Sequence, residues 1–161
     1  MKELFRPIII YAECLEYALL QFVIHCEKNM ARNISTILIK APVQKVWDAL
    51  TKPELVKQWQ YGSDLITDWE QGGDIRFRTE WDGKVFEQWG KVLEVQPLRM
   101  VKYSLFAPRP GLEDKPENYF VMSYVLDEKA GHTSLQIIQQ DDRSGAKQED
   151  HQGEENPILS A

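Results

Sequence analysis

The sequence predicts an α+β domain, in which an antiparallel sheet packs against two short helices that follow its first strand. A strand-like run of residues ends at Pro42, and helical spacing begins directly after it. Asp82-Gly83 is a dipeptide typical of tight hairpin turns, because both residues tolerate positive φ. Turns and loops join all the later strand-like segments, so the sheet of about seven strands should be antiparallel.

The first strand is expected over residues 34–41, where Pro42 prevents its continuation. The next apolar residues recur at helical spacing and share one helical face: Val43, Val46, Trp47 and Leu50. Because Trp47 belongs to this face, we expect it to be a core anchor between the first helix and the sheet, rather than a ligand contact.

A second short helix is expected to follow at once, so that the two helices together span residues 43–59. Thr51 can cap a helix, Pro53 suits a first helical turn, and the charge of Glu54 complements the helix dipole at an N-terminus. These residues are therefore expected to end one helix and begin the next.

Six further strands are expected between the helices and about residue 140. Turn residues and changes of alternation give their bounds: 64–69, 74–81, 84–95, 100–106, 119–126 and 133–140. Successive side chains of a strand point to opposite faces of its sheet. The inward set is expected to comprise Ile75, Phe77, Thr79, Phe120, Met122, Tyr124, Leu126, Leu135 and Ile137. Arg78 and Glu80 should face outward, and the segment 100–106 is apolar on both sides and is not assigned.

The composition is that of one globular domain. The chain has 161 residues, 43% of them hydrophobic, and a net charge of −6 from 19 basic and 25 acidic side chains. It has no cluster of Lys and Arg, which argues against nucleic acid as a partner. Its most apolar segment, residues 7–26, contains Glu13 and Glu16, so no membrane span is expected.

Few residues suggest catalysis or metal binding. Cys14 and Cys26 are the only cysteines, so neither a disulfide framework nor a cysteine metal site is expected, and a reducing cytoplasm fits best. The three histidines are spread along the chain: His25, His132 and His151. No serine stands in a nucleophile-elbow motif. The sequence therefore predicts no metal, no cofactor and no catalytic residue.

The segment from Ile39 to Glu54 follows the pattern apolar-x-Ala-Pro-x-x-x-Val-Trp-x-x-Leu-Thr-x-Pro-Glu. This pattern resembles the START-like superfamily, also called SRPBCC or birch-pollen-allergen-like. Within it, the chain is similar to the branch named after the activator of the ninety-kilodalton heat-shock chaperone's ATPase. Gly72-Gly73-Asp74 and Gly90-Lys91-Val92 extend the resemblance. It implies a helix-grip fold, in which a curved sheet and a long C-terminal helix enclose a ligand cavity.

The resemblance divides the chain into residues 34–161, the START-like domain, and residues 1–33, which lie outside it. The N-terminal part is expected to form an amphipathic helix, with an apolar stripe of Leu15, Leu19, Phe22 and Cys26. The C-terminal grip helix is expected to be missing or truncated, because residues 144–155 are polar. Three explanations remain open: the chain is a fragment, another protomer supplies the helix, or the N-terminal helix covers the sheet. Translation from Met30 is the alternative to this helix, and the apolar stripe favours a packed helix in the chain as given.

The expected function is binding of an apolar or amphipathic small molecule in the cavity under the sheet. Phe77, Thr79, Met122 and Tyr124 are expected to line this cavity, with Trp59 and Tyr61 near its mouth. This prediction combines the resemblance with the many aromatic residues on the strands, since ligand pockets are mostly apolar with a few convergent polar groups.

Two alternatives come from other functional classes. The first is an enzyme resembling the polyketide cyclases and dehydratases of the superfamily, using Arg78, Glu80 or Glu87 as an acid, base or oxyanion partner. The second is a chaperone-type protein-interaction module, with a chaperone or a second copy of the chain as partner. A fold resemblance alone does not choose among these functions.

Overall fold

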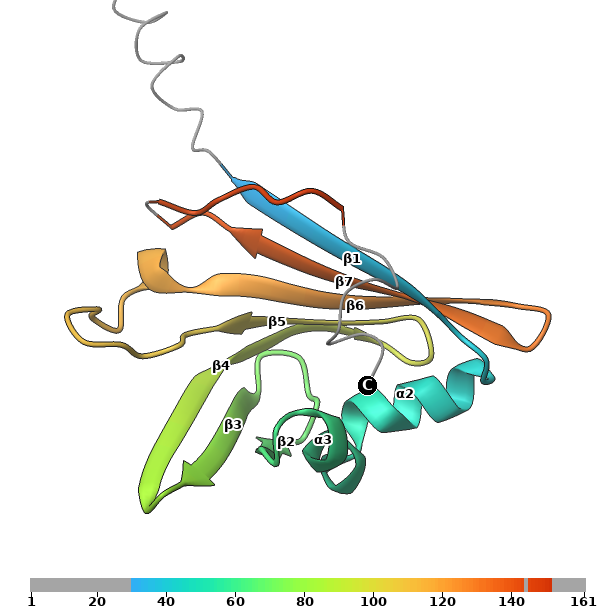
Figure 1. Cartoon of the computed structure of the whole chain (residues 1–161), viewed down its shortest axis with the longest axis horizontal. Coiled ribbons are helices and arrows are strands. Elements are labelled where there is room, and N and C mark those ends of the chain that lie inside the picture. The colour runs from blue at the N-terminus through green and yellow to red at the C-terminus, as the bar shows by residue number, and fades with distance from the viewer. Residues whose placement is uncertain (1–29, 144, 152–161) are drawn as a thin grey trace, which may run out of the picture.

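Seven strands form one antiparallel sheet in the computed structural model, which describes residues 30–143 and 145–151 (Figure 1). Their order across the sheet is β1-β7-β6-β5-β4-β3-β2. The strands are β1 (Ala31–Ile39), β2 (Asp64–Thr67), β3 (Asp74–Trp81), β4 (Lys84–Gln96), β5 (Met100–Leu105), β6 (Phe120–Lys129) and β7 (His132–Asp141). Between β1 and β2 lie the helices α2 (Val43–Thr51) and α3 (Pro53–Trp59), and η1 (Pro116–Asn118) is a 3₁₀ turn before β6.

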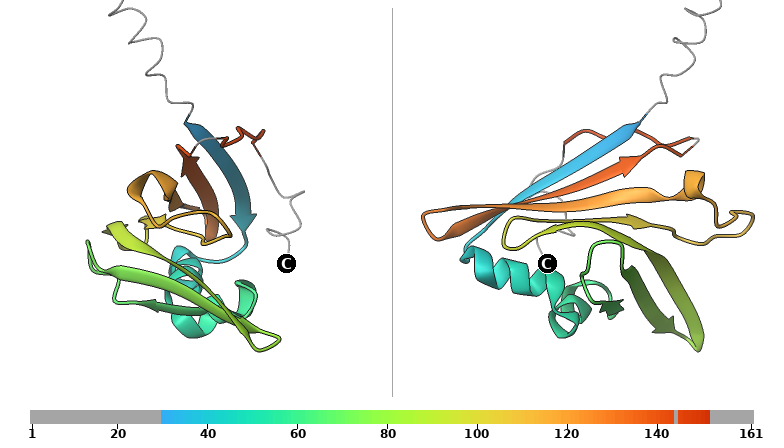
Figure 2. Two further views of the ribbon diagram at one scale, coloured as in Figure 1. Left: turned by 90° about the vertical axis from the view of Figure 1, so that its left-hand side faces the viewer. Right: turned by 180° about the vertical axis from the view of Figure 1, so that it is seen from behind.

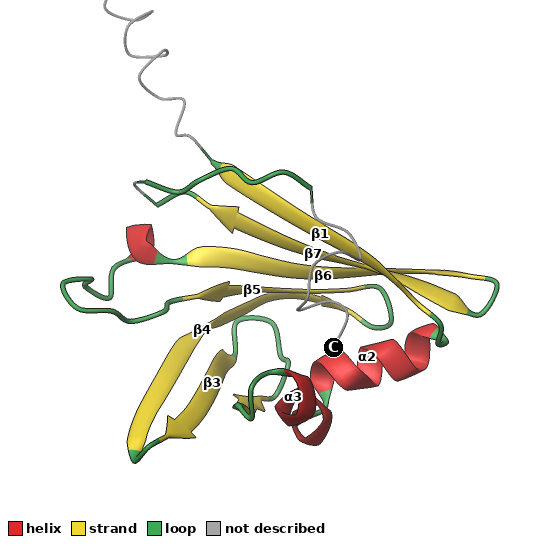
Figure 3. Ribbon diagram, in the orientation of Figure 1, coloured by secondary structure: helices red, strands yellow, loops and turns green. Residues whose placement is uncertain are grey.

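Both helices lie on the same side of the sheet, and the sheet curves toward them (Figures 2 and 3). We call this side the concave face and the opposite side the outer face. α2 packs against β6 and β7, while α3 packs against β2. The long strand β4 pairs with β3 through its first half and with β5 through its second, and its register shifts between Val92 and Glu94. This irregularity lets one strand take part in both halves of the curved sheet.

The two helices are tied together by tryptophan side chains from outside α2. The last carbonyls of a helix have no partner within it. In α2, the carbonyl of Ala49 accepts a hydrogen bond from the indole of Trp59 at 2.9 Å, and that of Thr51 accepts one from Trp69, also at 2.9 Å. α3 and the segment between β2 and β3 are thereby joined to the end of α2.

The core lies between the helices and the concave face. Its buried members come from both layers: Val46, Leu50, Val56, Leu65, Ile75, Phe77, Val92, Val101, Tyr103, Leu105, Tyr124, Leu126 and Leu135. Trp47 packs against this cluster but stays partly exposed, so it contacts the core without being enclosed by it. Its indole therefore contributes less buried area than a fully enclosed core anchor.

The predicted architecture is confirmed, with shifts at the ends of elements. β1 begins at Ala31 and ends at Ile39, whereas residues 34–41 were predicted, because the polar residues at its start still pair with β7. β6 runs to Lys129 because its hairpin with β7 continues past the apolar residues. At the Asp82-Gly83 turn both residues have positive φ, 50° and 69°, as the sequence predicted. The predictions for residues 1–29 and 152–161 lie outside the described residues.

The outer edge of β1 is covered by the tail that follows β7. The side chain of Gln148 accepts from the backbone N–H of Arg32 at 2.7 Å and donates to its carbonyl at 2.6 Å, as a neighbouring strand would. The Asn33 side chain donates to the carbonyl of Lys147 and accepts from the N–H of Glu149. The contacts with Gln148 satisfy the two backbone groups of Arg32, which an edge strand otherwise exposes for pairing with other chains.

A partly buried ion pair closes the end of β7. Nε and Nη2 of Arg143 donate to the two carboxylate oxygens of Asp141 at 2.8 and 2.6 Å, and only 6% of Asp141 is exposed. The guanidinium also lies 4.7 Å from the ring centroid of Phe120. The hydrogen bonds from Arg143 lower the pKa of Asp141, even though burial opposes this.

Asp141→Asn is expected to lower the free energy of unfolding by about 2 kcal/mol at neutral pH, because a charge-assisted pair is lost at a partly buried site. The folded pKa of Asp141 lies below its unfolded value, so the pair stabilises the fold above the unfolded pKa. This contribution is lost as the pH falls through the folded pKa. Urea denaturation across the acid range should therefore show wild type and variant converging below about pH 4.

Asp127→Asn is the matched control, since Asp127 pairs with Lys129 at 3.2 Å on the open surface. Exposed ion pairs of this kind contribute little to stability. Equal losses for the two variants, or a difference that does not change with pH, would contradict the assigned role of Asp141.

Candidate functional site

The concave face carries a continuous series of aromatic rings from strands β3, β5 and β6. Residues directly opposite each other in the register share a face, and Tyr103 lies opposite Met122 while Tyr124 lies opposite Val101. The rings of Phe77 and Tyr103 have centroids 5.9 Å apart, and those of Tyr103 and Tyr124 are 6.0 Å apart. These distances are typical of packed aromatic pairs. The three strands thus contribute to one apolar surface.

Two tyrosine hydroxyls meet in the middle of this surface. Tyr103 donates a hydrogen bond to the hydroxyl oxygen of Tyr124 at 3.2 Å, and the residues are only 2% and 6% exposed. Burial raises the pKa of both phenols, that of Tyr103 most strongly, so both stay neutral at physiological pH. Tyr124 acts as the acceptor, and its own hydrogen finds no further acceptor among the described residues. The pair therefore leaves one hydroxyl hydrogen without an acceptor within the described part of the chain.

Four of the six residues predicted to bind a ligand lie on the concave face. Phe77 and Tyr124 are buried in the core, and Met122 is half-buried against it. Thr79 lies on the face of Phe77, two positions along β3, and its hydroxyl is 2.5 Å from that of Ser63. The structure brings these four side chains onto one surface, and their contact with a ligand stays a prediction.

The two residues predicted at the cavity mouth lie at the surface beside α3. Trp59 is 39% exposed, and its indole N–H is already bonded to Ala49. Tyr61, in the turn after α3, is 79% exposed and has a positive φ of 49°. Neither belongs to the buried core cluster. The hydrogen bond of Trp59 joins α3 to α2, so this residue has a structural role. Its contact with a ligand stays a prediction.

The comparison with protein families identifies the fold. A family model described as Activator of Hsp90 ATPase homolog 1-like protein matches residues 40–157. The chain belongs to this family. The START-like resemblance inferred from the strand-to-helix motif is thereby confirmed. A search of curated proteins found no match to the chain.

Solved structures agree with the family assignment. The solution structure of a Cytophaga hutchinsonii protein is 34% identical over 67% of this chain and 75% of that one, with a TM-score of 0.57. CalU16 from Micromonospora echinospora is 23% identical over 68% and 59% of the chains, with a TM-score of 0.51. A Chromobacterium violaceum protein is 18% identical over 72% and 83%, with a TM-score of 0.59. The last two share the fold alone.

The sequence assigns no face to the central tyrosine of this domain, Tyr103. Residues 100–106 are apolar on both sides by sequence, yet Tyr103 is among the most deeply buried residues of the domain. A signal was present, because Lys102 and Ser104 alternate with the apolar residues and mark the outer face. Trp81 and Phe86 belong to the aromatic residues noted on the strands, but the sequence does not place them among the ligand-binding residues. They extend the concave face to the tip of the β3–β4 hairpin, where they are 76% and 58% exposed.

The charged residues considered for an enzyme lie on the other side of the sheet. Arg78 is directly opposite Glu87 in the register, and Glu87 is 3.5 Å from Arg76, so these side chains share the outer face. Glu80 is exposed on the same side of β3. Within the described residues there is no group of three His, Cys, Asp or Glu that could hold a metal ion. In the same part of the chain, no helix has the length and apolar character to cross a membrane.

Proposed function

We propose that this family member binds an apolar or amphipathic small molecule against its concave face, without covalent chemistry. The observation that supports this most is the buried Tyr103–Tyr124 hydroxyl pair within an otherwise aromatic surface. An apolar surface with a few convergent polar groups is the usual construction of a small-molecule site. The rings would contact the apolar body of the ligand, and the Tyr124 hydroxyl would donate to its polar group.

The protonation state of the pair favours binding over acid–base catalysis. Burial raises both phenol pKa values, so neither hydroxyl gives up its proton readily near neutral pH. An efficient general base has a pKa close to the working pH. The three residues considered for a cyclase-like reaction, Arg78, Glu80 and Glu87, face away from this surface. These facts support a binding role for the concave face.

A second candidate is protein interaction, with a chaperone or a second copy of the chain as partner. Trp81 and Phe86 favour it, because they leave large apolar area exposed at the hairpin tip. Exposed aromatic residues of this kind are common in protein interfaces. Their position at the end of the concave face is also consistent with contacts to a large ligand. The experiment below therefore distinguishes small-molecule binding from protein interaction.

The neutral fluorescent dye N-phenyl-1-naphthylamine tests small-molecule binding. We expect saturable fluorescence enhancement with the wild type, and a loss of affinity of about tenfold or more in Met122→Lys, because the new charge would enter the apolar surface. Val121→Lys is the matched control: Val121 is the half-buried neighbour of Met122 on β6, and its side chain points to the outer face. It should leave dye affinity unchanged within about twofold. Thermal melts of both variants check that they are folded.

Two outcomes would contradict the proposal. One is a wild-type protein that gives no saturable enhancement. The other is an equal response of the folded Met122→Lys and Val121→Lys variants, which would place the dye away from the concave face. If dye binding instead disappears in Trp81→Ser with Met122→Lys unaffected, the exposed hairpin tip is the binding surface, and the interaction function is favoured.

A further inference from the structure

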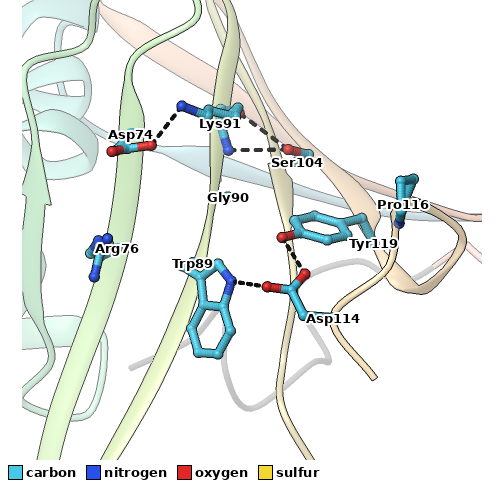
Figure 4. A pocket seen from close by; sticks show the side chains of 9 residues that line it. All are labelled: Asp74, Arg76, Trp89, Gly90, Lys91, Ser104, Asp114, Pro116 and Tyr119. Carbon is cyan, nitrogen blue, oxygen red and sulfur yellow. Dashed lines mark hydrogen bonds and ion pairs between the residues drawn. The ribbon is translucent and has the colours of Figure 1, made fainter. Parts of the chain in front are cut away.

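The outer face of the sheet carries a pocket, on the side of the sheet opposite to the tyrosine pair. It has a volume of about 530 Å³ and lies over β3, β4 and β5, beside the segment that leads to β6 (Figure 4). Its lining consists of Asp74, Arg76, Trp89, Gly90, Lys91, Ser104, Asp114, Pro116 and Tyr119. Arg76 and Trp89 are directly opposite each other in the register, on the face opposite to Phe77. The pocket therefore opens away from the proposed concave site.

One wall of this outer pocket is held by a network centred on Asp114. Its two carboxylate oxygens accept hydrogen bonds from the Trp89 indole at 3.0 Å and the Tyr119 hydroxyl at 2.7 Å (Figure 4). Below them, the buried ring of Phe106 packs against both aromatic walls, with centroids 5.2 Å from Trp89 and 5.4 Å from Tyr119. The aromatic walls are thus fixed before any ligand arrives, which lowers the ordering cost of binding.

The opposite wall offers hydrogen-bond donors that the protein uses little. Among the described residues, the guanidinium of Arg76 makes one ion-pair contact, 3.5 Å from Glu87, and its side chain is 49% exposed. The other cation, Lys91, is engaged more closely, with its ammonium 2.7 Å from Asp74. A guanidinium carries five N–H donors in a planar fork that matches a carboxylate. Arg76 is therefore the lining residue best able to receive an added acceptor.

The charges of the lining residues cancel, and Glu87 lies beside Arg76, so the pocket does not attract an anion from a distance. Two cations, Arg76 and Lys91, stand against two anions, Asp74 and Asp114. The hydrogen bonds from Trp89 and Tyr119 also compensate the charge of Asp114. The pocket must then recognise its ligand through short-range contacts. These are hydrogen bonds from the Arg76 guanidinium and packing against the rings of Trp89 and Tyr119.

We propose that the outer pocket binds a flat, mostly apolar molecule carrying one carboxylate. The carboxylate pairs with the guanidinium of Arg76, and the flat body lies against Trp89 and Tyr119. Gly90 and Ser104 form the floor between these walls. This site is independent of the proposed concave site, since it uses other residues and the other face of the sheet.

The Trp89 indole gives a direct readout. In ¹H–¹⁵N spectra its N–H signal is identified with Trp89→Phe, and 2-naphthoate is titrated into the otherwise unchanged protein. We expect a saturable shift of this signal. The neutral analogue 2-naphthalenemethanol, which has the same rings, should bind about tenfold more weakly, because it cannot form the charged fork.

A comparison of Arg76→Gln with Arg78→Gln distinguishes direct hydrogen bonding by the Arg76 guanidinium from a general effect of positive charge. Both remove one positive charge from exposed positions of the outer face of β3. Arg76→Gln should weaken naphthoate binding about tenfold and leave the alcohol unaffected, whereas Arg78→Gln should change either affinity by less than about twofold. Absence of a saturable shift, equal binding of acid and alcohol, or equal losses in the two variants would each overturn the proposal. None of these results bears on dye binding at Met122.

Discussion

Gly90→Ala is expected to lower the free energy of unfolding by at least about 3 kcal/mol, more than most single substitutions do. A Cβ atom at this position would lie 1.9 Å from the carbonyl oxygen of Ser104 and 2.6 Å from its carbon. These are backbone atoms of the neighbouring strand, so no side chain can swing away to make room. The backbone pairing of Trp89 with Phe106 holds the two strands together next to this contact.

Gly131→Ala serves as the control in urea denaturation. Gly131 has a φ of 76° with open space around its Cβ position, so the substitution should cost only the strain of a left-handed residue, about 1 kcal/mol. If the two alanine variants lost the same stability, the close approach of β4 and β5 at Gly90 would not constrain the fold as described.

Tyr103→Ala should also destabilise the domain strongly, by about 3–5 kcal/mol. Tyr103 is 2% exposed and packs against the rings of Trp69, Phe77 and Tyr124. Removing it leaves a cavity at the point where β3, β5 and β6 meet the helices. Tyr103→Phe keeps the ring and removes the hydroxyl alone, so it should cost about 1 kcal/mol.

Phe86→Ala is the control for this series, because Phe86 is an aromatic residue of the same face that is 58% exposed. Its truncation should change stability by less than about 1 kcal/mol. If Tyr103→Ala and Phe86→Ala lowered the free energy of unfolding by the same amount, the aromatic series would not be the centre of the core. A Tyr103→Phe variant as unstable as Tyr103→Ala would mean that the hydroxyl, rather than the ring, dominates.

The fold was predictable because the backbone preferences of short segments agree with the strand pairing of the whole sheet. The change from β1 to α2 at Pro42 and the Asp82-Gly83 turn depend on backbone preferences that act over a few residues, and both appear in the structure. The ends of β1 and β6 were less predictable. Polar residues continue these strands because a neighbouring strand supplies hydrogen-bond partners, which no local pattern reports.

The candidate site was predictable only in part. Alternation placed Phe77, Met122 and Tyr124 on the concave face, since β3 and β6 each have a plainly larger apolar side. The hydroxyl contact between Tyr103 and Tyr124 depends on the register of β5 with β6, which the sequence does not encode locally. The outer pocket depends on the path of the loop that carries Asp114, and loop paths leave no periodic signal.

The claim that the concave face binds small molecules is tested most directly by locating a bound probe. Intermolecular nuclear Overhauser effects can be recorded between N-phenyl-1-naphthylamine and the assigned side chains of the labelled protein. We expect contacts from the dye protons to the Met122 methyl group and to the rings of Phe77 and Tyr124, all on the concave face. Contacts confined to Trp89 and Tyr119 on the outer face, or to Trp81 at the hairpin tip, would contradict the account.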